Sequence, residues 1–351
     1  MSRFRGALYP AYLAAYFSIK PGQNPEIAEL IRSVVIQEML HMTISCNLLN
    51  AVKTADQPGP MIDTPNFIPA YPGPLPEGLR PGLTVSLKKC SIEHVRDVFM
   101  SIEEPDVTPD HVKHAMTIGW FYDQIENAME ALDDGSLFNS NPSELQVATW
   151  PDNQPGQGVS ILVSNLADAK RLIQFIKDSG EGSSVSGLLS YVTGDHGDPE
   201  PIYTGLDGKE ALSHYYKFSE IVEGRRIVAD NRGHFSYTGE PIPFDPAGVY
   251  NMVDNPNTNS LPAGSYVRDK SEQFDRAYTN LLRKLHWVFN GHPNEINETK
   301  RMMYALTPLA HQLLQLPIPV TPSGDESSGD EEEREEAVPV QVAGPSFLYR
   351  P

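Results

Sequence analysis

Residues 25–52, PEIAELIRSVVIQEMLHMTISCNLLNAV, carry the clearest structural signal in this sequence. Their apolar side chains recur with a period of about 3.6 residues, which is typical of a long helix with a buried face. Asn24 can cap this helix, Pro25 suits its first turn, and Glu26 lies near the positive end of the helix dipole. The segment is therefore expected to be a long helix that ends near Val52.

Two polar side chains fall on the apolar face of this helix. Counting by three and four residues from Ile31 places Glu38 and His41 on the inward side. A carboxylate and an imidazole three residues apart can bind one metal ion, as in di-iron carboxylate bundles. A Glu-x-x-His pattern also arises by chance roughly once in a chain of this length. A buried, metal-free Glu–His pair therefore remains the alternative.

The rest of the chain predicts a mainly α fold. Residues 56–109 are rich in proline and glycine and predict a long crossover, with one strand at 83–87 and a short helix at 92–102. Four long helices with such a crossover form a bundle, and bundles house cofactors between facing helices. The helices expected besides 25–52 are residues 9–19, 111–132, 165–177, 208–223, 271–290 and 294–316.

His214 is the next candidate ligand. In the predicted helix 208–223 it shares a face with Phe218 and Ile221, which should point inward. A single histidine on an apolar face is more often a core residue than a ligand. Glu210 lies four residues earlier and can approach the same site if the helix rotates.

The remaining polar candidates are expected to be solvated. They lie at helix ends or beside a helix stripe, where water satisfies them: Glu103, Glu104, His111, His114, Asp123 and Glu126. The segment SGEG at 179–182 predicts a turn after a helix. Neither a phosphate-binding glycine loop nor a G-x-S-x-G nucleophile elbow occurs in the sequence.

Composition narrows the class of protein. The formal net charge of −19 disfavours binding to nucleic acids and anionic membranes. No apolar run approaches the roughly 20 residues of a membrane helix. The two cysteines, Cys46 and Cys90, make no disulfide framework, so a cytoplasmic location is expected.

Three regions are predicted. Residues 1–225 form the bundle with its insertions, and residues 226–320 form a C-terminal extension that packs on it. Residues 321–351 form an acidic tail, because the run at 324–336 has eight acids and one arginine. That run lacks the apolar residues needed to offset ordering entropy and is expected to be disordered. The final segment, AGPSFLYRP (343–351), carries aromatic residues that can dock back onto the body.

Many separated segments resemble the ferritin-like domain of the iminophenyl-pyruvate dimer synthase family. The resemblance implies a ferritin-like four-helix bundle with a long crossover and additional C-terminal helices. It also implies secondary metabolism, since family members oxidatively couple imine forms of an aromatic 2-oxo acid. The segments are residues 18–52, YPGPLPEGL (71–79), FMSIEEP (99–105), TIGWFYDQIENAMEAL (117–132), SGEG (179–182), ALSHYYKFSEIVEGR (211–225), NPNTNSLPAGSY (255–266), FDRAYTNLLRKLHWVFNG (274–291) and AGPSFLYRP (343–351).

The resemblance also implies an incomplete di-iron site. Such a bundle takes one Glu from each of two helices and Glu-x-x-His from each of the other two. Glu38, His41 and His214 match three of these ligands. The three other positions lack a carboxylate: the first-helix position falls near Arg3–Arg5, the third-helix position is Trp120, and the fourth-helix position is Ala211, beside Glu210.

Two functions follow. The first is an iron-dependent oxidative enzyme, mononuclear or dinuclear, with Glu38, His41, His214 and Glu210 as metal ligands and a small-molecule substrate. Its aromatic-friendly pocket would be lined by Tyr12, Tyr16, Phe121, Tyr122, Tyr215 and Tyr216. The second is a metal-free binding or accessory protein without a cofactor. In that protein Trp120 fills the space of the metal cluster and Arg5 pairs with Glu38. Both leave the oligomeric state open.

Overall fold

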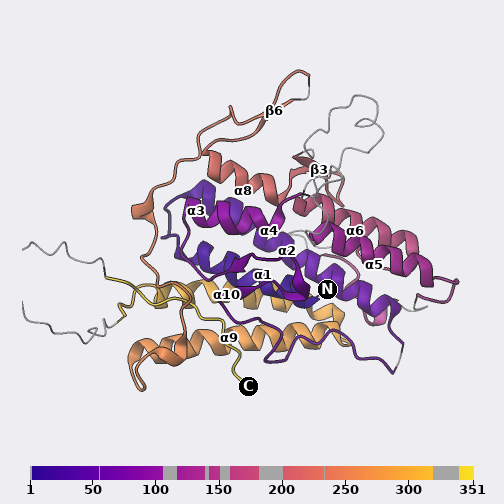
Figure 1. The fold of residues 1–351 in the computed structure, drawn as a ribbon. Coiled ribbons are helices and arrows are strands. Elements are labelled where there is room, and N and C mark those ends of the chain that lie inside the picture. Colours follow the sequence, from indigo (N-terminus) through magenta and orange to yellow (C-terminus); the bar gives the residue numbers. More distant parts are fainter. Residues whose placement is uncertain are drawn as a thin grey trace, which may run out of the picture.

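The computed structural model describes residues 2–54, 56–105, 117–138, 142–150, 159–181, 201–232, 234–318 and 340–351, without the side chains of residues 2–7 and 181. Helices surround one long central helix, α2 (Pro25–Val52), as Figure 1 shows. The other helices of this half are α1 (Ser2–Ser18), α3 (Ile92–His94), the π-helix η2 (Val95–Met100), α4 (Ser101–Glu103), α5 (Ile118–Leu132), α6 (Leu166–Glu181) and α8 (His214–Glu223).

The helices pack in a defined order around α2. α1 lies along α2, and α8 packs against η2 and contacts both α2 and α6. α5 packs against α6 on the outside. The short helical run α3–η2–α4 therefore packs as part of the bundle, against α8, although the sequence predicted only a short helix inside a crossover.

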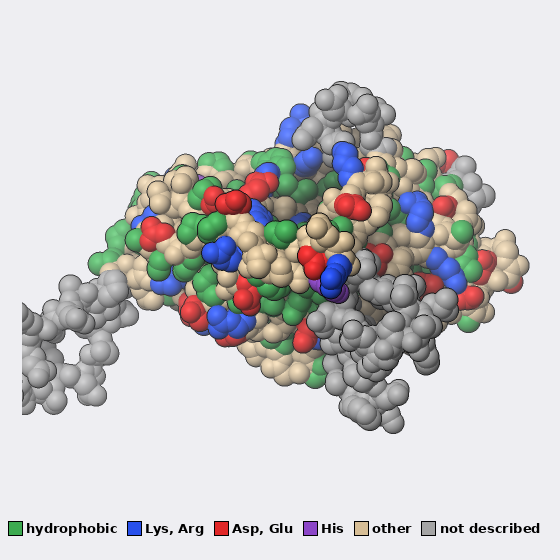
Figure 2. Space-filling model, turned by 90° about the horizontal axis from the view of Figure 1, so that it is seen from above, with side chains coloured by type: hydrophobic (Ala, Val, Ile, Leu, Met, Phe, Trp, Pro, Cys, Tyr) green, Lys and Arg blue, Asp and Glu red, His purple; other side chains and the backbone are tan. Residues whose placement is uncertain are grey.

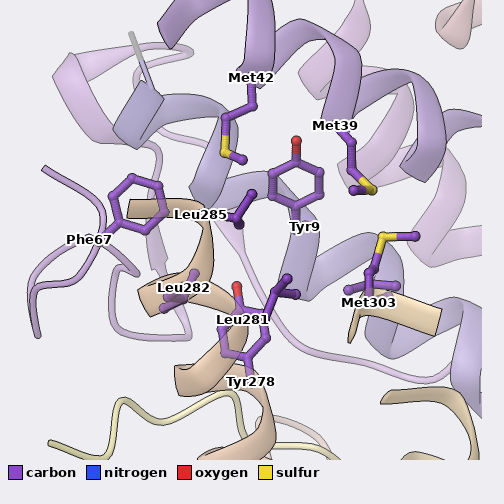
Figure 3. Close-up of a pocket in the computed structure, with 10 residues that line it drawn as sticks. Tyr9, Met39, Met42, Phe67, Tyr278, Leu281, Leu282, Leu285 and Met303 are labelled. Atoms are coloured by element: carbon purple, nitrogen blue, oxygen red, sulfur yellow. The ribbon is translucent and has the colours of Figure 1, made fainter. Parts of the chain in front are cut away.

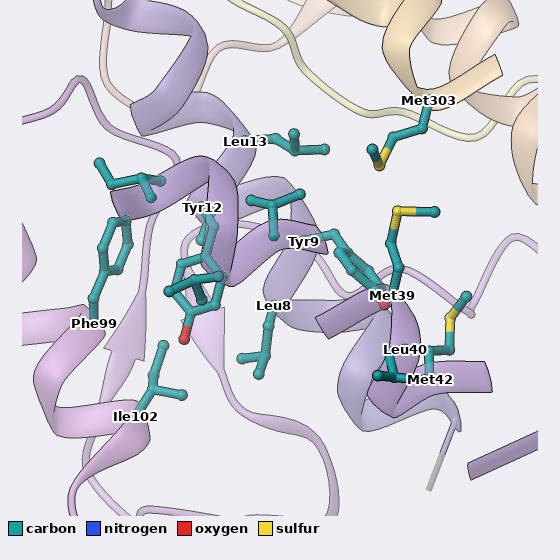
Figure 4. Close-up of a cluster of buried hydrophobic side chains, with 14 of the residues drawn as sticks. Leu8, Tyr9, Tyr12, Leu13, Met39, Leu40, Met42, Phe99, Ile102 and Met303 are labelled. Atoms are coloured by element: carbon teal, nitrogen blue, oxygen red, sulfur yellow. The ribbon is translucent and has the colours of Figure 1, made fainter. Parts of the chain in front are cut away.

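The core between α1, α2 and η2 is apolar and aromatic (Figure 4). The Tyr12 ring meets the Phe99 ring edge-on at 4.7 Å between centroids, and both side chains are fully buried. The Tyr9 hydroxyl donates to the backbone carbonyl of Glu38 at 2.5 Å, which fixes α1 against the middle of α2. Burial of aromatic side chains of this size dominates core energetics, so the position of α1 follows from its aromatic residues.

In the described part of the chain, three two-stranded antiparallel hairpins lie beside the helices. The hairpin of β3 and β4 pairs Tyr203 with Ala211. The strands are β1 (Gly73–Pro74) with β2 (Thr84–Val85), β3 (Ile202–Thr204) with β4 (Glu210–Leu212), and β5 (Val228–Ala229) with β6 (Phe235–Ser236). Short 3-10 turns lie at Pro76–Gly78, Pro142–Glu144, Pro246–Gly248, Thr258–Ser260 and Pro293–Glu295.

Helices α9 (Tyr266–Phe289) and α10 (Ile296–Leu313) pack on each other, and α10 contacts α1. The chain end, residues 340–351, returns to this layer. Phe347 is 1% exposed, and its ring packs edge-on against Phe274 and Tyr278. The terminal segment therefore belongs to the folded body.

A buried carboxylate on α9 holds this terminal segment. Oδ1 of Asp275 accepts from the Ser346 hydroxyl at 2.6 Å and from the Leu348 amide at 3.1 Å. Oδ2 accepts from the Thr258 hydroxyl at 2.7 Å and from Arg350 Nη2 at 3.1 Å. Burial raises the pKa of Asp275, and the donors from Ser346, Thr258 and Arg350 oppose that rise. One side chain thus joins three separate parts of the chain.

The mainly helical bundle is confirmed, but several details of the prediction are wrong. The predicted helix 208–223 begins only at His214, because Glu210–Leu212 pair with β3 as strand β4. Asn24 does not cap α2: it adopts φ 43°, and its side chain bonds both backbone groups of Asp245. Residues 111–116 of the predicted helix 111–132, with His111 and His114, lie outside the described residues.

The surface agrees with the acidic composition. Acidic and basic side chains are interspersed over the face in Figure 2, and no continuous basic patch gathers on its described part.

Within the part of the chain that the structure describes, no helix combines the length and apolarity needed to cross a bilayer. The acidic run at 324–336, expected to be disordered, lies outside the described residues.

Asp275→Ala should destabilise the protein. The substitution removes the carboxylate that accepts from the Thr258 and Ser346 hydroxyls and from the Leu348 amide, and it leaves part of the Arg350 charge unpaired. Loss of one partner of a buried charged network costs about 3 kcal/mol of unfolding free energy. Urea unfolding followed by circular dichroism measures the change. Asp269→Ala, which removes an exposed carboxylate of the same helix, is the matched control, and equal stability losses would show that the buried network is unimportant.

Both cysteine thiols should be unreactive in the folded protein. Burial raises the pKa of the Cys46 thiol strongly and that of Cys90 to about 12, so the reactive thiolate is scarce at pH 8. Titration with a disulfide reagent should label neither thiol in native protein and both after denaturation. Rapid labelling of the native protein would mean that one of these residues is accessible.

Candidate metal centre

Four buried side chains from three helices meet in the middle of the bundle. Glu38 and His41 come from α2, Glu103 from the end of α4 and His214 from the first turn of α8, and each is 0% exposed. Glu38 Oε1 lies 3.0 Å from His41 Nδ1 and 3.2 Å from His214 Nδ1. Glu103 Oε1 lies 3.6 Å from His214 Nδ1. The helix face predicted from the sequence does turn inward.

The contact with a serine on α6 indicates which ring nitrogen of His41 carries the N–H proton. Ser179 donates its hydroxyl proton to the Phe175 carbonyl at 2.6 Å, so its oxygen is left to accept. His41 Nε2 lies 2.7 Å from that oxygen and therefore carries the N–H. In the neutral imidazole, Nδ1 then bears the lone pair that faces Glu38.

The same reasoning applies to His214 through Gln37. Lys217 Nζ can only donate, and it lies 2.8 Å from Gln37 Oε1, which fixes the orientation of the amide. His214 Nε2 lies 3.1 Å from the same Oε1 and must donate to it. In neutral His214 the lone pair is again on Nδ1, directed at the oxygen of Glu38.

Each Nδ1 lone pair thus faces a carboxylate oxygen. Two electron-rich atoms at 3.0–3.2 Å repel each other unless a cation or a proton lies between them. A metal ion bound by both Nδ1 atoms satisfies the arrangement, and so do two protons that make both imidazoles cationic. Hydrogen bonding of the distal nitrogen to a fixed acceptor is the usual way to orient a metal-binding histidine.

Glu103 is the functional residue that the sequence analysis missed. The expectation that it lies in a solvated turn is wrong: it is fully buried, and Tyr12 donates to its Oε1 at 2.8 Å. A Cβ at Gly180 would lie only 3.2 Å from Glu103 Oε2, so glycine leaves room for the carboxylate. Oε2 makes no hydrogen bond within the described part of the chain. Such an orphaned buried oxygen fits a metal ligand.

A signal for Glu103 was present in the sequence. It follows Phe99 by four residues and Val95 by eight, so it lies on the buried stripe of its helical run. The adjacent proline suggested a helix end and a solvated turn. The run also contains the π-helix η2, and such wide turns are frequent at functional sites.

Three of the four donors, from Glu38, His41 and His214, lie close enough together to bind one divalent ion, and the Glu103 carboxylate lies beside His214 as a further donor. Two imidazole nitrogens and two carboxylates form a neutral set with a 2+ ion, and this mixed set suits iron, manganese or zinc. Glu38, His41 and His214 alone offer ligand atoms within 4.8 Å of one another. Across the described residues, the additional carboxylates of a dinuclear centre are missing, because Ala211 lies in β4 and Trp120 is not buried.

Several expected neighbours of the site lie elsewhere. Glu210 is exposed on β4 and does not join the cluster, because the chain turns between it and His214. Trp120 is 43% exposed on α5, so the idea that its indole fills the space of a metal cluster is wrong. Asp123 pairs with Lys177 at 2.6 Å on the surface. The proposed partner Arg5 lies outside the described side chains.

The groups behind the ligands should tune metal affinity. Ser179→Ala removes the acceptor that fixes His41, and a lost outer partner of this kind weakens metal binding by about 10–100-fold. Tyr12→Phe should act in the same direction through Glu103. Dissociation constants from competition with a chelating dye measure the effect. Thr43→Val, which removes a buried hydroxyl of α2 bonded only to the Met39 carbonyl in the described structure, is the control. Equal affinities in all three variants would contradict this role.

Comparisons with known proteins agree with the observed bundle. A ferritin-like family model matches residues 6–223, which is more than half of the chain. The crystal structure of a ferritin-like protein from Caulobacter vibrioides is similar, with 22% identity and a TM-score of 0.50 over 88% of this chain and 91% of that one. Among curated proteins, none matches this chain. The match over the whole bundle shows that the chain belongs to the ferritin-like family.

Proposed function

We propose that this protein is an oxidative metalloenzyme that holds one divalent ion, iron by preference, between Glu38, His41, His214 and Glu103. The observation that carries the proposal is the orientation of the two histidines. Both donate through Nε2 to fixed acceptors and turn Nδ1 toward the same carboxylate oxygen. A neutral imidazole held in this way is oriented as metal-binding histidines usually are.

Iron in such a site supplies one-electron and dioxygen chemistry when bound. The chain itself does three things. It binds through two imidazoles and two carboxylates, and it orients them through Ser179, Gln37 and Tyr12. It also excludes bulk water, since all four ligand side chains are 0% exposed. Exclusion of water strengthens every electrostatic interaction inside the site.

The narrower assignment rests on sequence resemblance. Similarity to the iminophenyl-pyruvate dimer synthase family, spread over segments from residue 18 to residue 351, supports a role in the oxidation of a small aromatic molecule in secondary metabolism. An aromatic 2-oxo or imino acid is the substrate class that this resemblance suggests. The site is compatible with such oxidation, and a cytoplasmic location fits two cysteines that remain free thiols.

A metal-free binding or accessory protein is the second candidate. The charge balance of the cluster favours it. If both imidazoles are protonated, the two cations lie beside the two buried carboxylates of Glu38 and Glu103, and the net charge of the cluster is zero. Such a network is electrostatically satisfied without an ion. The two candidates differ in metal content and in reactivity toward dioxygen.

Metal analysis separates the candidates. Protein produced in iron-supplemented medium should contain about one equivalent of iron or manganese per chain by elemental analysis. His41→Ala and His214→Ala should lose the metal, whereas Glu210→Gln, at an exposed position of β4, should keep it. Less than half an equivalent in the unaltered protein would count against the enzyme, and full retention in both histidine variants would place the site elsewhere.

Reactivity distinguishes an enzyme from a passive metal site. Ferrous-loaded protein should consume dioxygen, followed with an oxygen electrode, several-fold faster than the same concentration of ferrous iron in buffer. The His214→Ala variant should match the buffer. A metal-replete protein that is inert to dioxygen would contradict the oxidative function while leaving the metal centre intact.

A further inference from the structure

A recess of about 400 Å³ opens between α2, α6 and the β3–β4 hairpin. Three aromatic side chains contribute to its wall: Trp150, Phe175 and Tyr203. The rings of Phe175 and Tyr203 are 6.0 Å apart, edge to face. Pockets for small organic ligands span roughly 300–1,000 Å³ and are lined mainly by apolar and aromatic groups. The recess therefore has the size and the wall of a site for a small aromatic molecule.

The recess adjoins the proposed metal centre. The Phe175 ring packs edge-on against the His41 ring, with 5.8 Å between the ring centroids. Gln37, which also lines the recess, accepts from His214 Nε2 through Oε1 at 3.1 Å. The four proposed ligand side chains are each 0% exposed. An occupant of the recess is therefore separated from the ion by one layer of side chains.

The other cavity beside α2 is unsuitable for a substrate. Figure 3 shows it between Tyr9, Met39, Met42 and the leucines of α9. Its volume is about 30 Å³, which is room for a water-sized molecule, and its accessible lining is apolar. The aromatic residues expected to form a pocket do not form one in the core: Tyr12 and Tyr122 are fully buried by packing.

The charged groups around the recess balance one another. Among the described residues that line it, Asp207, Lys209 and Glu210 are charged, and Lys209 pairs with Asp207 at 3.2 Å. Lys217 lies on the far side of the wall, where it donates to Gln37 at 2.8 Å, and its positive charge offsets the exposed Glu210 carboxylate. Charge therefore selects neither an anion nor a cation, and hydrogen bonding decides which ligand fits.

The Tyr203 hydroxyl is the hydrogen-bond donor that the wall offers to a ligand. Its oxygen accepts from Gln37 Nε2, and its own proton has no acceptor in the described part of the chain. Gln37 Oε1 cannot take this proton, because it already accepts from Lys217 and His214. Burial raises the pKa of Tyr203 to about 12, so the proton is present at neutral pH. A ligand that brings an acceptor oxygen completes the hydrogen bonding of this group.

We propose that the recess binds a small aromatic molecule that carries a carbonyl oxygen, with its ring against Trp150 and Phe175 and its oxygen on the Tyr203 hydroxyl. The inference rests on the proposed function in one respect, since it places the substrate of the oxidative centre beside this wall. The proposed substrate class, an aromatic 2-oxo or imino acid, includes molecules with such an oxygen. Tyr203 is then the substrate contact, and two consecutive hydrogen bonds through Gln37 join it to His214.

Two neutral probes of nearly the same shape test the contact. Acetophenone has a carbonyl oxygen where α-methylstyrene has a methylene group. Dissociation constants for the full-length protein at pH 7 are measured by NMR titration. Tyr203→Phe should weaken binding of acetophenone about fivefold, because it removes one hydrogen bond to the ligand. The same variant should leave the affinity for α-methylstyrene unchanged, which also shows that the recess is intact.

Two further variants locate the site. Trp150→Ala should weaken both probes to a similar degree, because it removes part of the aromatic wall. Tyr237→Phe removes a hydroxyl that donates to Ser219 outside the lining of the recess, and it should change neither affinity. No binding of either probe, or a Tyr203→Phe variant that affects both probes alike, would overturn the proposal.

A crystal of the unaltered protein soaked in acetophenone tests the contact without a variant. The carbonyl oxygen should lie about 2.7 Å from the Tyr203 hydroxyl oxygen. Acetophenone bound elsewhere, or bound in the recess with its oxygen turned away from Tyr203, would contradict the assigned contact.

Failure of this inference is distinguishable from failure of the proposed function. Metal-free His214→Ala protein that binds both probes as the unaltered protein does would support the recess, whatever the metal analysis shows. Metal-replete protein that binds neither probe would overturn the recess and leave the oxidative centre untouched.

Discussion

The middle of this bundle depends on the burial of one carboxylate, Glu38, opposite two imidazole nitrogens. A buried carboxylate without compensation costs several kcal/mol. The chain surrounds it with His41 from the same helix and His214 from a helix more than 170 residues away. These contacts require α2 and α8 to lie side by side, as they do.

The surrounding elements are placed to hold those imidazoles. α6 contributes Ser179, whose hydroxyl is committed to the Phe175 carbonyl and so can only accept from His41. α1 contributes Tyr12, which orients Glu103 across the site. Gln37 is held by Lys217, and burial lowers the pKa of that lysine to about 8, with Glu220 and Glu103 opposing the shift. Each of these outer groups holds one metal-binding side chain in one orientation. Such hydrogen bonds orient the side chains of a metal site before the ion binds.

The sequence predicted the central helix and half of the site well, because both follow from one strong periodicity. Glu38 and His41 lie on the buried stripe of α2, and His214 comes close to both from α8. Glu103 was missed because a glutamate pair before a proline indicates a solvated helix end. Its burial depends on Tyr12 and Gly180, which are distant in the chain.

Glu210 failed as a candidate for a different reason. It was placed four residues before His214 on one helix, but residues 210–212 pair with Ile202–Thr204 as a strand, and the helix begins only after them. The aromatic residues of the chain end were compatible with docking, but the sequence alone left the question open. The anchor of the chain end, Asp275, could not be predicted, since a carboxylate on an amphipathic helix is usually solvated.

Crystallography at the iron absorption edge tests the central claim most directly. If iron is bound as proposed, an anomalous peak appears between Nδ1 of His41, Nδ1 of His214 and the carboxylates of Glu38 and Glu103. A map of iron-soaked crystals without such a peak, in which both Nδ1 atoms stay within about 3.2 Å of Glu38, would show instead that protons fill the role assigned to the metal.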